Sequence, residues 1–174
     1  QTHDNKQLKY TAGKRKYTVF SQWDVFRALN PLFTLTQIER LPDMINSMLQ
    51  LYRDNGLLPV WDLSTWEANT MTGYHSIPII ADAILKGVKG FNYQEAYTAM
   101  KKSAMQQQRG TPEYIKYGYL PQDKHGWSVT ITLEYAYDDW CIAQVAKKLG
   151  YESDYKQFMQ RAMSYKNLFD KSTG

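Results

Sequence analysis

The sequence has 174 residues, of which 43 % are hydrophobic and 22 % are charged, and its formal net charge is +4. This length and composition predict one folded domain with an apolar core and exclude a largely disordered chain. The single cysteine, Cys141, excludes an internal disulfide and a cysteine-based zinc cluster. No apolar run reaches the length of about 18 residues that a membrane-spanning helix needs, so we expect no membrane partner.

Basic residues are concentrated near the N-terminus. Those within residues 1–16 are Lys6, Lys9, Lys14, Arg15 and Lys16. A nucleic-acid-binding surface would place such charges along one folded face, so we predict a solvated polar lead-in over residues 1–16 and no nucleic-acid partner. Residues 15–20 alternate like a short strand or an extended lead-in. The folded domain is expected over residues 17–174.

Two helices are predicted in the first third of the chain. The first begins after Ser21, a good N-cap residue, and Pro31 should kink or end it. The second opens with a capping box from Thr36 to Glu39 and stops at Asn55 and Gly56. Its apolar residues recur at helical spacing, namely Ile38, Leu41, Ile45, Met48 and Tyr52.

The middle of the chain predicts two more helices. The third begins near Ser76, and because apolar residues cover nearly its whole circumference, it should be buried on all sides. The fourth begins with the capping signature of Asn92 to Glu95 and extends to about Gln107. Gly110 and Pro112 are expected to end it.

The last two helices are predicted over residues 128–149 and 153–169. The sixth has one apolar stripe, made by Tyr155, Phe158, Ala162, Tyr165 and Phe169. The links near residues 35, 90 and 151 are short, which is typical of helical hairpins, whereas the links over 55–75 and 109–127 are each about 20 residues and therefore functional candidates. The predicted fold class is all-α, with six helices as three antiparallel hairpins whose long links gather at one end.

The long links and the adjacent helix starts are rich in aromatic and ionisable residues. They contain Trp23, Asp24, Trp61, Asp62, Trp66, Glu67, His75, Tyr117, Tyr119, Asp123, His125 and Trp127. Flat aromatic faces beside carboxylates and imidazoles suit sugar rings, since C–H faces stack on indoles and hydroxyls bond to charged groups. The alternative is that the tryptophans fix long loops to the core.

Asp24 is in the first turn of the first predicted helix, next to Trp23. A carboxylate is favoured there by the helix dipole, and it could face a ligand or serve only as an N-terminal charge. Arg27 lies three residues further on, and we expect it to form an ion pair with Asp24 within the helix.

Four further ionisable residues are candidates. Glu67 and His75 belong to the first long link, where His75 could act as acid, base, ligand or hydrogen-bond donor, or could simply cap the next helix. Glu134 and Asp138 are four residues apart on one helical face, where like charges need compensation. They could bind substrate or metal near the loops, or hold neighbouring helices together. The next three residues we assign to packing and interhelix contacts, namely Asp139, Trp140 and Cys141.

Four segments of the sequence resemble glycoside hydrolase family ninety-two. They are YTVFSQWDVFRALNPLFTL, IERLPDMINSMLQLYRDNGLLPVWDL, MTGYHSIPIIADAILKGVKGF and TLEYAYDDWCIAQVAKKLG, and the likeness spans about residues 17–170. The resemblance implies a calcium-dependent, inverting exo-α-mannosidase whose catalytic domain is an (α/α)6 toroid packed on an N-terminal β-sandwich. Six helices would form the first half of that toroid.

The resemblance also implies where the site residues lie. The general acid, the general base and the main calcium ligands are expected on segments C-terminal to this chain, so we assign no catalytic residue and no metal ligand here. The mannose-contacting positions of the family match Trp23 and Asp24, and the link before the third helix matches Glu67 and His75.

The function implied is the trimming of terminal mannose from glycans, with α-1,2 linkages expected, by a periplasmic or secreted enzyme. The chain alone is expected to be inactive. Because half a toroid leaves apolar surface without neighbours, we also expect self-association. Two alternatives stay open, namely a non-catalytic helical-hairpin repeat that binds a peptide or protein, and a toroid glycosidase acting on another sugar.

Overall fold

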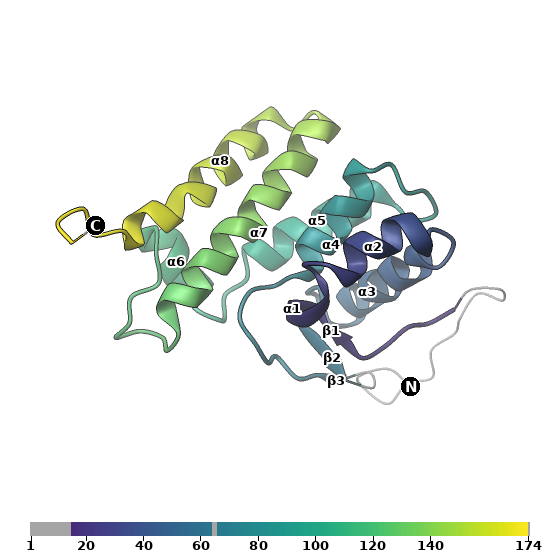
Figure 1. The fold of residues 1–174 in the computed structure, drawn as a ribbon, viewed down its shortest axis with the longest axis horizontal. Helices are drawn as coiled ribbons and strands as arrows, with labels where there is room; N and C mark the ends of the chain where they lie inside the picture. The colour runs from purple at the N-terminus through teal and green to yellow at the C-terminus, as the bar shows by residue number, and fades with distance from the viewer. Residues whose placement is uncertain (1–14, 64–65, 174) are drawn as a thin grey trace.

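The fold was analysed in a computed structural model that describes residues 15–63 and 66–173 (Figure 1). Most of the predicted lead-in, residues 1–14, lies outside the described residues. The prediction of an all-α fold is confirmed, but the described residues form eight α-helices and one 3-10 helix instead of six helices. None of these helices is long and apolar enough to cross a bilayer.

The first predicted helix is interrupted. It consists of α1 (Gln22–Val25) and α2 (Leu29–Thr36), separated by residues 26–28. The expectation that Pro31 would kink or end this helix was wrong, because Pro31 lies in the first turn of α2. A proline is tolerated there, since the first turn of a helix does not use the missing backbone N–H.

Helix α3 (Leu41–Asn55) begins later than the predicted capping box. Thr36 is the last residue of α2, where its hydroxyl donates to the Leu32 carbonyl at 3.1 Å, so it does not cap α3. Ile38 is consequently outside the helix and 56 % exposed. The end of α3 is as predicted, because Gly56 adopts a left-handed φ of +82° directly after Asn55.

Helices α4 (Ser76–Leu85) and α5 (Tyr93–Ala104) form the second pair. Helix α4 is buried around nearly its whole circumference, as its sequence predicts. The cap of α5 is also confirmed, because the Asn92 side chain accepts the backbone N–H of Glu95 at 3.1 Å. The helix ends at Ala104, three residues before the predicted end at Gln107.

Both long links contain structure that the sequence did not predict, and the first pairs with a short strand at the end of residues 15–20, where a short strand or an extended lead-in was expected. The strands β1 (Phe20–Ser21), β2 (Trp61–Leu63) and β3 (Trp66–Glu67) form a small antiparallel sheet in which Phe20 pairs with Asp62 and Asp62 with Glu67. The second link contains α6 (Thr111–Tyr117). Gly110 and Pro112, which were expected to end the preceding helix, instead cap and begin α6.

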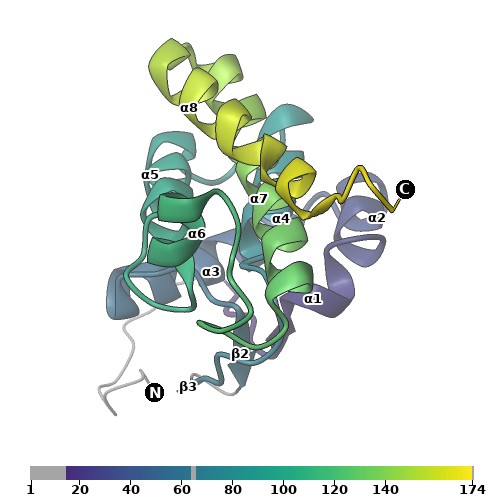
Figure 2. The same cartoon turned by 90° about the vertical axis from the view of Figure 1, so that its left-hand side faces the viewer.

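The long helix α7 (Ser128–Leu149) forms the last pair with α8 (Glu152–Ala162), which runs back along it (Figures 1 and 2). The predicted sixth helix was too long, because a 3-10 helix replaces it at Met163–Leu168. Phe158 and Ala162 are buried as expected, whereas Tyr165 and Phe169 are exposed. Helices α4 and α7 pack against each other at the centre of the molecule.

Candidate functional site

Trp23 and Asp24 lie at the start of α1, at the end of the molecule where the small sheet lies (Figure 1). Asp24 is exposed and accepts a hydrogen bond from the Ser21 hydroxyl, so its carboxylate stays at the surface. Trp23 is half-buried, and its indole N–H donates to Glu134 Oε1 of α7 at 3.3 Å. This contact holds the indole ring in place through its N–H edge.

Arg27 does not form the expected ion pair with Asp24. Its Nη2 atom lies 3.2 Å from Glu134 Oε1, and its guanidinium lies over the Phe26 and Trp23 rings, 4.6 and 5.7 Å from their centroids. Since α1 ends at Val25, Asp24 and Arg27 are not on one continuous helix. The three-residue spacing therefore does not bring their side chains together as it would within a helix.

A row of charged side chains extends from this surface into the interior. Glu134 Oε2 lies 2.7 Å from His75 Nε2, and Asp138 Oδ1 lies 2.8 Å from His75 Nδ1. The contact with Asp138 is a well-aligned hydrogen bond, whereas the contact with Glu134 is a close ion pair with poorer alignment. The compensation that two like charges on one helical face require is therefore supplied by His75, which lies between them.

Burial and stacking hold His75 in place. The imidazole is 1 % exposed and stacks on the Phe26 ring with a centroid distance of 3.9 Å. The backbone N–H of Tyr74 donates to Asp138 Oδ2 at 3.0 Å, so both Asp138 oxygens accept hydrogen bonds from one short segment before α4. Asp138 thus joins α7 to the first long link.

The electrostatics of this row favour a charged histidine. Burial disfavours the imidazolium, but Asp138 and Glu134 outweigh it and raise the pKa of His75 to about 9. Burial also acts against the Glu134 carboxylate, yet His75 and Arg27 hold its pKa below the usual range. Burial raises the pKa of the Asp138 carboxyl, and His75 opposes that rise.

Glu67 is engaged by the backbone of its own loop. Its Oε2 accepts the N–H of Val60 at 2.7 Å, and its Oε1 accepts the N–H groups of Trp61 and Asn69 at 2.9 and 2.6 Å. Arg109 Nη1 donates to the Asn69 carbonyl at 2.9 Å from the other long link. Glu67 therefore fixes the shape of the loop around β2 and β3. This loop lies at the same end of the molecule as Asp24.

The residues after Asp138 were predicted to make packing and interhelix contacts. Asp139 does so, because Arg161 Nε of α8 lies 2.9 Å and the Tyr114 hydroxyl of α6 lies 3.0 Å from its Oδ2. Cys141 is buried. Trp140, by contrast, is 43 % exposed and stacks only loosely on Tyr137, with centroids 6.4 Å apart.

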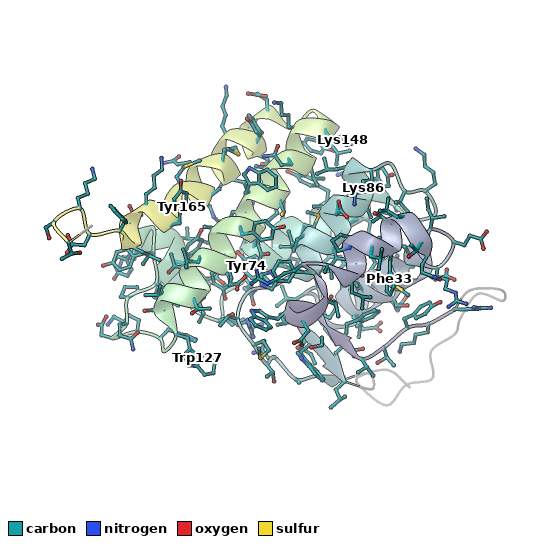
Figure 3. The ribbon with its side chains drawn as sticks, viewed as in Figure 1. Phe33, Tyr74, Lys86, Trp127, Lys148 and Tyr165 are labelled. Atoms are coloured by element: carbon teal, nitrogen blue, oxygen red, sulfur yellow. The ribbon has the colours of Figure 1, made fainter. Side chains whose placement is uncertain are left out.

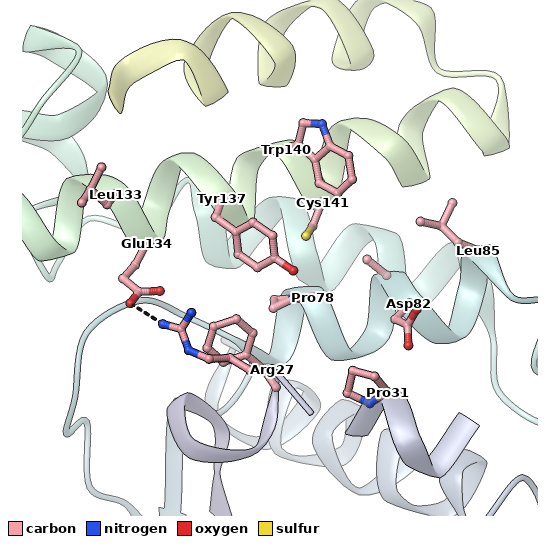
Figure 4. Close-up of a pocket in the computed structure, with 12 residues that line it drawn as sticks. Arg27, Pro31, Pro78, Asp82, Leu85, Leu133, Glu134, Tyr137, Trp140 and Cys141 are labelled. Atoms are coloured by element: carbon pink, nitrogen blue, oxygen red, sulfur yellow. Dashed lines mark hydrogen bonds and ion pairs between the residues drawn. The ribbon is translucent and has the colours of Figure 1, made fainter. Parts of the chain in front are cut away.

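A hollow of about 720 Å³ lies between α2, α4 and α7, directly beside the Arg27–Glu134 ion pair (Figure 4). Its lining includes Phe26, Pro31, Pro78, Asp82, Leu85, Leu133, Tyr137, Trp140 and Cys141. Trp127, the residue directly before α7, is exposed, whereas Tyr74 is buried (Figure 3). The exposed lining is mainly apolar and aromatic, with charges at its rim.

The arrangement suits binding better than acid–base chemistry. Asp24 offers an exposed carboxylate, but both oxygens of Glu134, Glu67 and Asp138 already face donors within the chain. Within residues 15–63 and 66–173, no three acidic, histidine or cysteine side chains come together as a metal site. The described residues do not fit calcium, and calcium remains an expectation for groups outside them.

Sequence reasoning missed the part played by Glu134 and Arg27. The only signal was the pair of like charges at 134 and 138, which called for compensation without saying from where. His75 is 59 residues before Glu134 in the sequence, and Trp23 is 111 residues before it. Such contacts depend on how three helical pairs pack, which no local pattern records.

Comparison with known proteins identifies the family. Residues 1–174 match the model of the glycosyl hydrolase family 92 catalytic domain. A protein of Arthroderma benhamiae described as an uncharacterised secreted glycosidase is 27 % identical over 144 residues, which cover 73 % of this chain and 18 % of that protein.

Solved structures from Bacteroides thetaiotaomicron give the same result. A family GH92 α-mannosidase in complex with mannoimidazole is 50 % identical, with a TM-score of 0.92 over 95 % of this chain and 22 % of that chain. A family GH92 inverting mannosidase is 33 % identical, with a TM-score of 0.87 over 92 % of this chain and 23 % of that chain. The likeness confirms the helical-toroid fold class, and this chain, which spans about a fifth of its relatives' length, belongs to the glycosyl hydrolase family 92 catalytic domains.

Proposed function

We propose that this chain supplies one wall of the sugar-binding site of an inverting exo-α-mannosidase that removes terminal mannose from glycans, with α-1,2 linkages preferred. Two solved relatives, an α-mannosidase bound to mannoimidazole and an inverting mannosidase, support the sugar and the stereochemistry. Since the chain spans about a fifth of their length, the activity belongs to a larger enzyme.

The observation that carries this proposal is the exposed Asp24 carboxylate next to a fixed Trp23. Asp24 can accept hydrogen bonds from sugar hydroxyls, and these are strong because the acceptor is charged. Trp23 is oriented by Glu134, so its ring can stack on a sugar without losing side-chain freedom on binding. Glu67 and His75 contribute indirectly, by holding the neighbouring loop and helix.

The remaining parts of the enzyme come from outside this chain. We assign the general acid, the general base and the calcium ligands to later segments, and the partners of the chain to the rest of the toroid and an N-terminal β-sandwich. Bound calcium would polarise or orient sugar hydroxyls. A secreted or periplasmic location is proposed because the fungal relative is a secreted glycosidase.

The test of the wall is an Asp24→Asn substitution in the complete enzyme. Loss of the charged acceptor should lower kcat/KM for an α-mannoside by about 10- to 100-fold, the equivalent of one hydrogen bond to a charged group. Asp123→Asn is the matched control, because Asp123 is 73 % exposed and its ion pair among the described residues is with the adjacent Lys124 at 3.5 Å. Equal rates for both variants would contradict the proposal.

Companion assays separate the alternatives. Aryl glycosides of other sugars distinguish a mannosidase from another toroid glycosidase, and the anomer first released distinguishes inversion from retention. The 174-residue chain alone should release no mannose with or without calcium. Release by this chain would place the acid and base within it, and a complete protein that binds peptides without hydrolysing any glycoside would favour the repeat module.

A further inference from the structure

The buried row of charges ends at Arg27 and at Trp23, which is one of the two residues proposed to contact the sugar. We propose that His75 is a positioning residue: as an imidazolium held between Asp138 and Glu134, it fixes the Glu134 carboxylate, which in turn orients Trp23 and Arg27. The nature of the ligand rests on the proposed function, whereas the arrangement of the row does not.

The charge on His75 follows from counting protons. Each ring nitrogen lies within 2.8 Å of a carboxylate oxygen, and an ionised carboxylate can only accept. A neutral imidazole has one N–H and would leave a lone pair facing one of the two carboxylates. With two N–H groups, the Nδ1–H donates to Asp138 and the Nε2–H faces Glu134 in the ion pair, so the cationic form matches this geometry.

The charge balance supports the same form. Asp138 is fully buried and Glu134 is 11 % exposed, so neither carboxylate is fully solvated. With a cationic His75, the row of two carboxylates, one imidazolium and Arg27 is neutral overall. Without that cation, two carboxylates four residues apart on α7 would repel in a region of low dielectric. Arg27 cannot replace this cation, because it lies on the exposed side of Glu134 and does not separate Glu134 from Asp138.

Glu134 is the residue through which this charge acts. Its Oε2 faces His75, while its Oε1 faces both the Trp23 indole and the Arg27 guanidinium at 3.3 and 3.2 Å. These three partners approach from two directions and restrain the Glu134 carboxylate, which restrains them in return. The ring of Phe26, the residue directly after α1, stacks on His75 and lies under Arg27.

The first experiment uses this 174-residue chain and needs no sugar. Nitrogen-15 spectra of the histidine rings should show both nitrogens of His75 protonated at pH 7, with a change to the neutral ring near pH 9. The charged groups facing His75 are Asp138 and Glu134 from α7, with Arg27 beyond Glu134. A neutral His75 ring at pH 7 would overturn the proposal.

The second experiment tests the positioning itself. In His75→Gln, hydrogen exchange of the Trp23 indole N–H, assigned with a Trp23→Phe variant, should accelerate about tenfold or more. His125→Gln is the matched control, because the hydrogen-bond partner of His125 Nδ1 within residues 15–63 and 66–173 is the neighbouring Gly126 carbonyl. Glu134→Gln, at a partly solvated site, should give a similar acceleration even if His75→Gln folds poorly. Unchanged exchange in Glu134→Gln would refute the positioning role.

The third experiment separates this inference from the proposed function. In the complete enzyme, His75→Gln should raise KM for the mannoside about tenfold and change kcat less than about threefold, because it loosens binding without touching the reacting atoms. A loosened Trp23 with unchanged kinetics in both His75→Gln and Asp24→Asn would show that the sugar binds elsewhere, while the positioning role stands. Altered kinetics in Asp24→Asn with a firmly held Trp23 in His75→Gln would refute the positioning role alone.

Discussion

At the scale of single residues, two adjacent buried carboxylates in α7 contact different parts of the fold. Asp138 faces His75 and the first long link, whereas Asp139 faces Arg161 and Tyr114. Burial raises the pKa of Asp139 to about 7, although Arg161 opposes it. A buried carboxylate is tolerated only with such partners, so each aspartate specifies which element packs on its side of α7.

The raised pKa of His75 predicts how stability depends on pH. An unfolded histidine releases its proton near pH 6.5, whereas the folded one keeps it until about pH 9. The contribution is therefore complete below pH 6.5 and is lost as the pH rises to 9. We expect the free energy of unfolding to fall by roughly 2–3 kcal/mol between pH 7 and 9.

Urea denaturation at pH 7, 8 and 9 measures this fall. His75→Gln should flatten the dependence over this interval, whereas His125→Gln should leave it unchanged. A parent chain whose stability is constant from pH 7 to 9 would contradict the expectation.

At the scale of elements, the sequence predicted helices well and their ends poorly. Helix α4 was predictable because burial on all sides demands apolar residues on all sides. Strands β2 and β3 were not, since each has two or three residues and forms only by pairing across the fold, whereas the alternation of residues 15–20 did suggest a short strand or an extended lead-in near β1. Helix α6 was missed because Gly110 and Pro112 can end one helix or begin another, and only the packed structure distinguishes the two.

The two capping signatures give a direct comparison of prediction with structure. Asn92→Ala removes the acceptor of the Glu95 N–H and should lower the free energy of unfolding by about 1 kcal/mol. The Thr36 hydroxyl does not cap α3, because it donates to the Leu32 carbonyl. Thr36→Ala should therefore change the free energy of unfolding by no more than about 0.5 kcal/mol. Denaturation of both variants under one condition checks the difference. A cost for Thr36→Ala equal to that for Asn92→Ala would mean that Thr36 does cap α3.

At the scale of the whole molecule, the fold class was predictable but the assembly of the site was not. The alternation of short and long links indicated helical hairpins with their irregular segments at one end. Which side chains meet at that end depends on packing, as the contact between Trp23 and Glu134 shows. Trp23 and Asp24 were proposed as site residues from family likeness, whereas Arg27 was assigned the wrong partner because α1 was taken to be longer than it is.

The hollow leads to the last prediction, that the isolated chain self-associates through it. Leu85, Leu133, Tyr137 and Trp140 line it and are each 39–47 % exposed, an apolar surface that water disfavours. Light scattering should show a molecular mass that rises with concentration. Leu133→Lys should suppress this rise, whereas Ile115→Lys, at an exposed position on α6 outside the hollow, should not. A monomer at all concentrations would refute the prediction.

The link between Trp23 and Glu134 also has a consequence for biosynthesis. A ribosome makes residue 23 long before residue 134, and a four-residue helix such as α1 has little stability of its own. The Trp23 side chain therefore cannot contact Glu134 until 111 further residues have been synthesised. The surface proposed to face the sugar can therefore form only after most of this chain has been made, and chaperones that bind exposed aromatic residues have that interval in which to act.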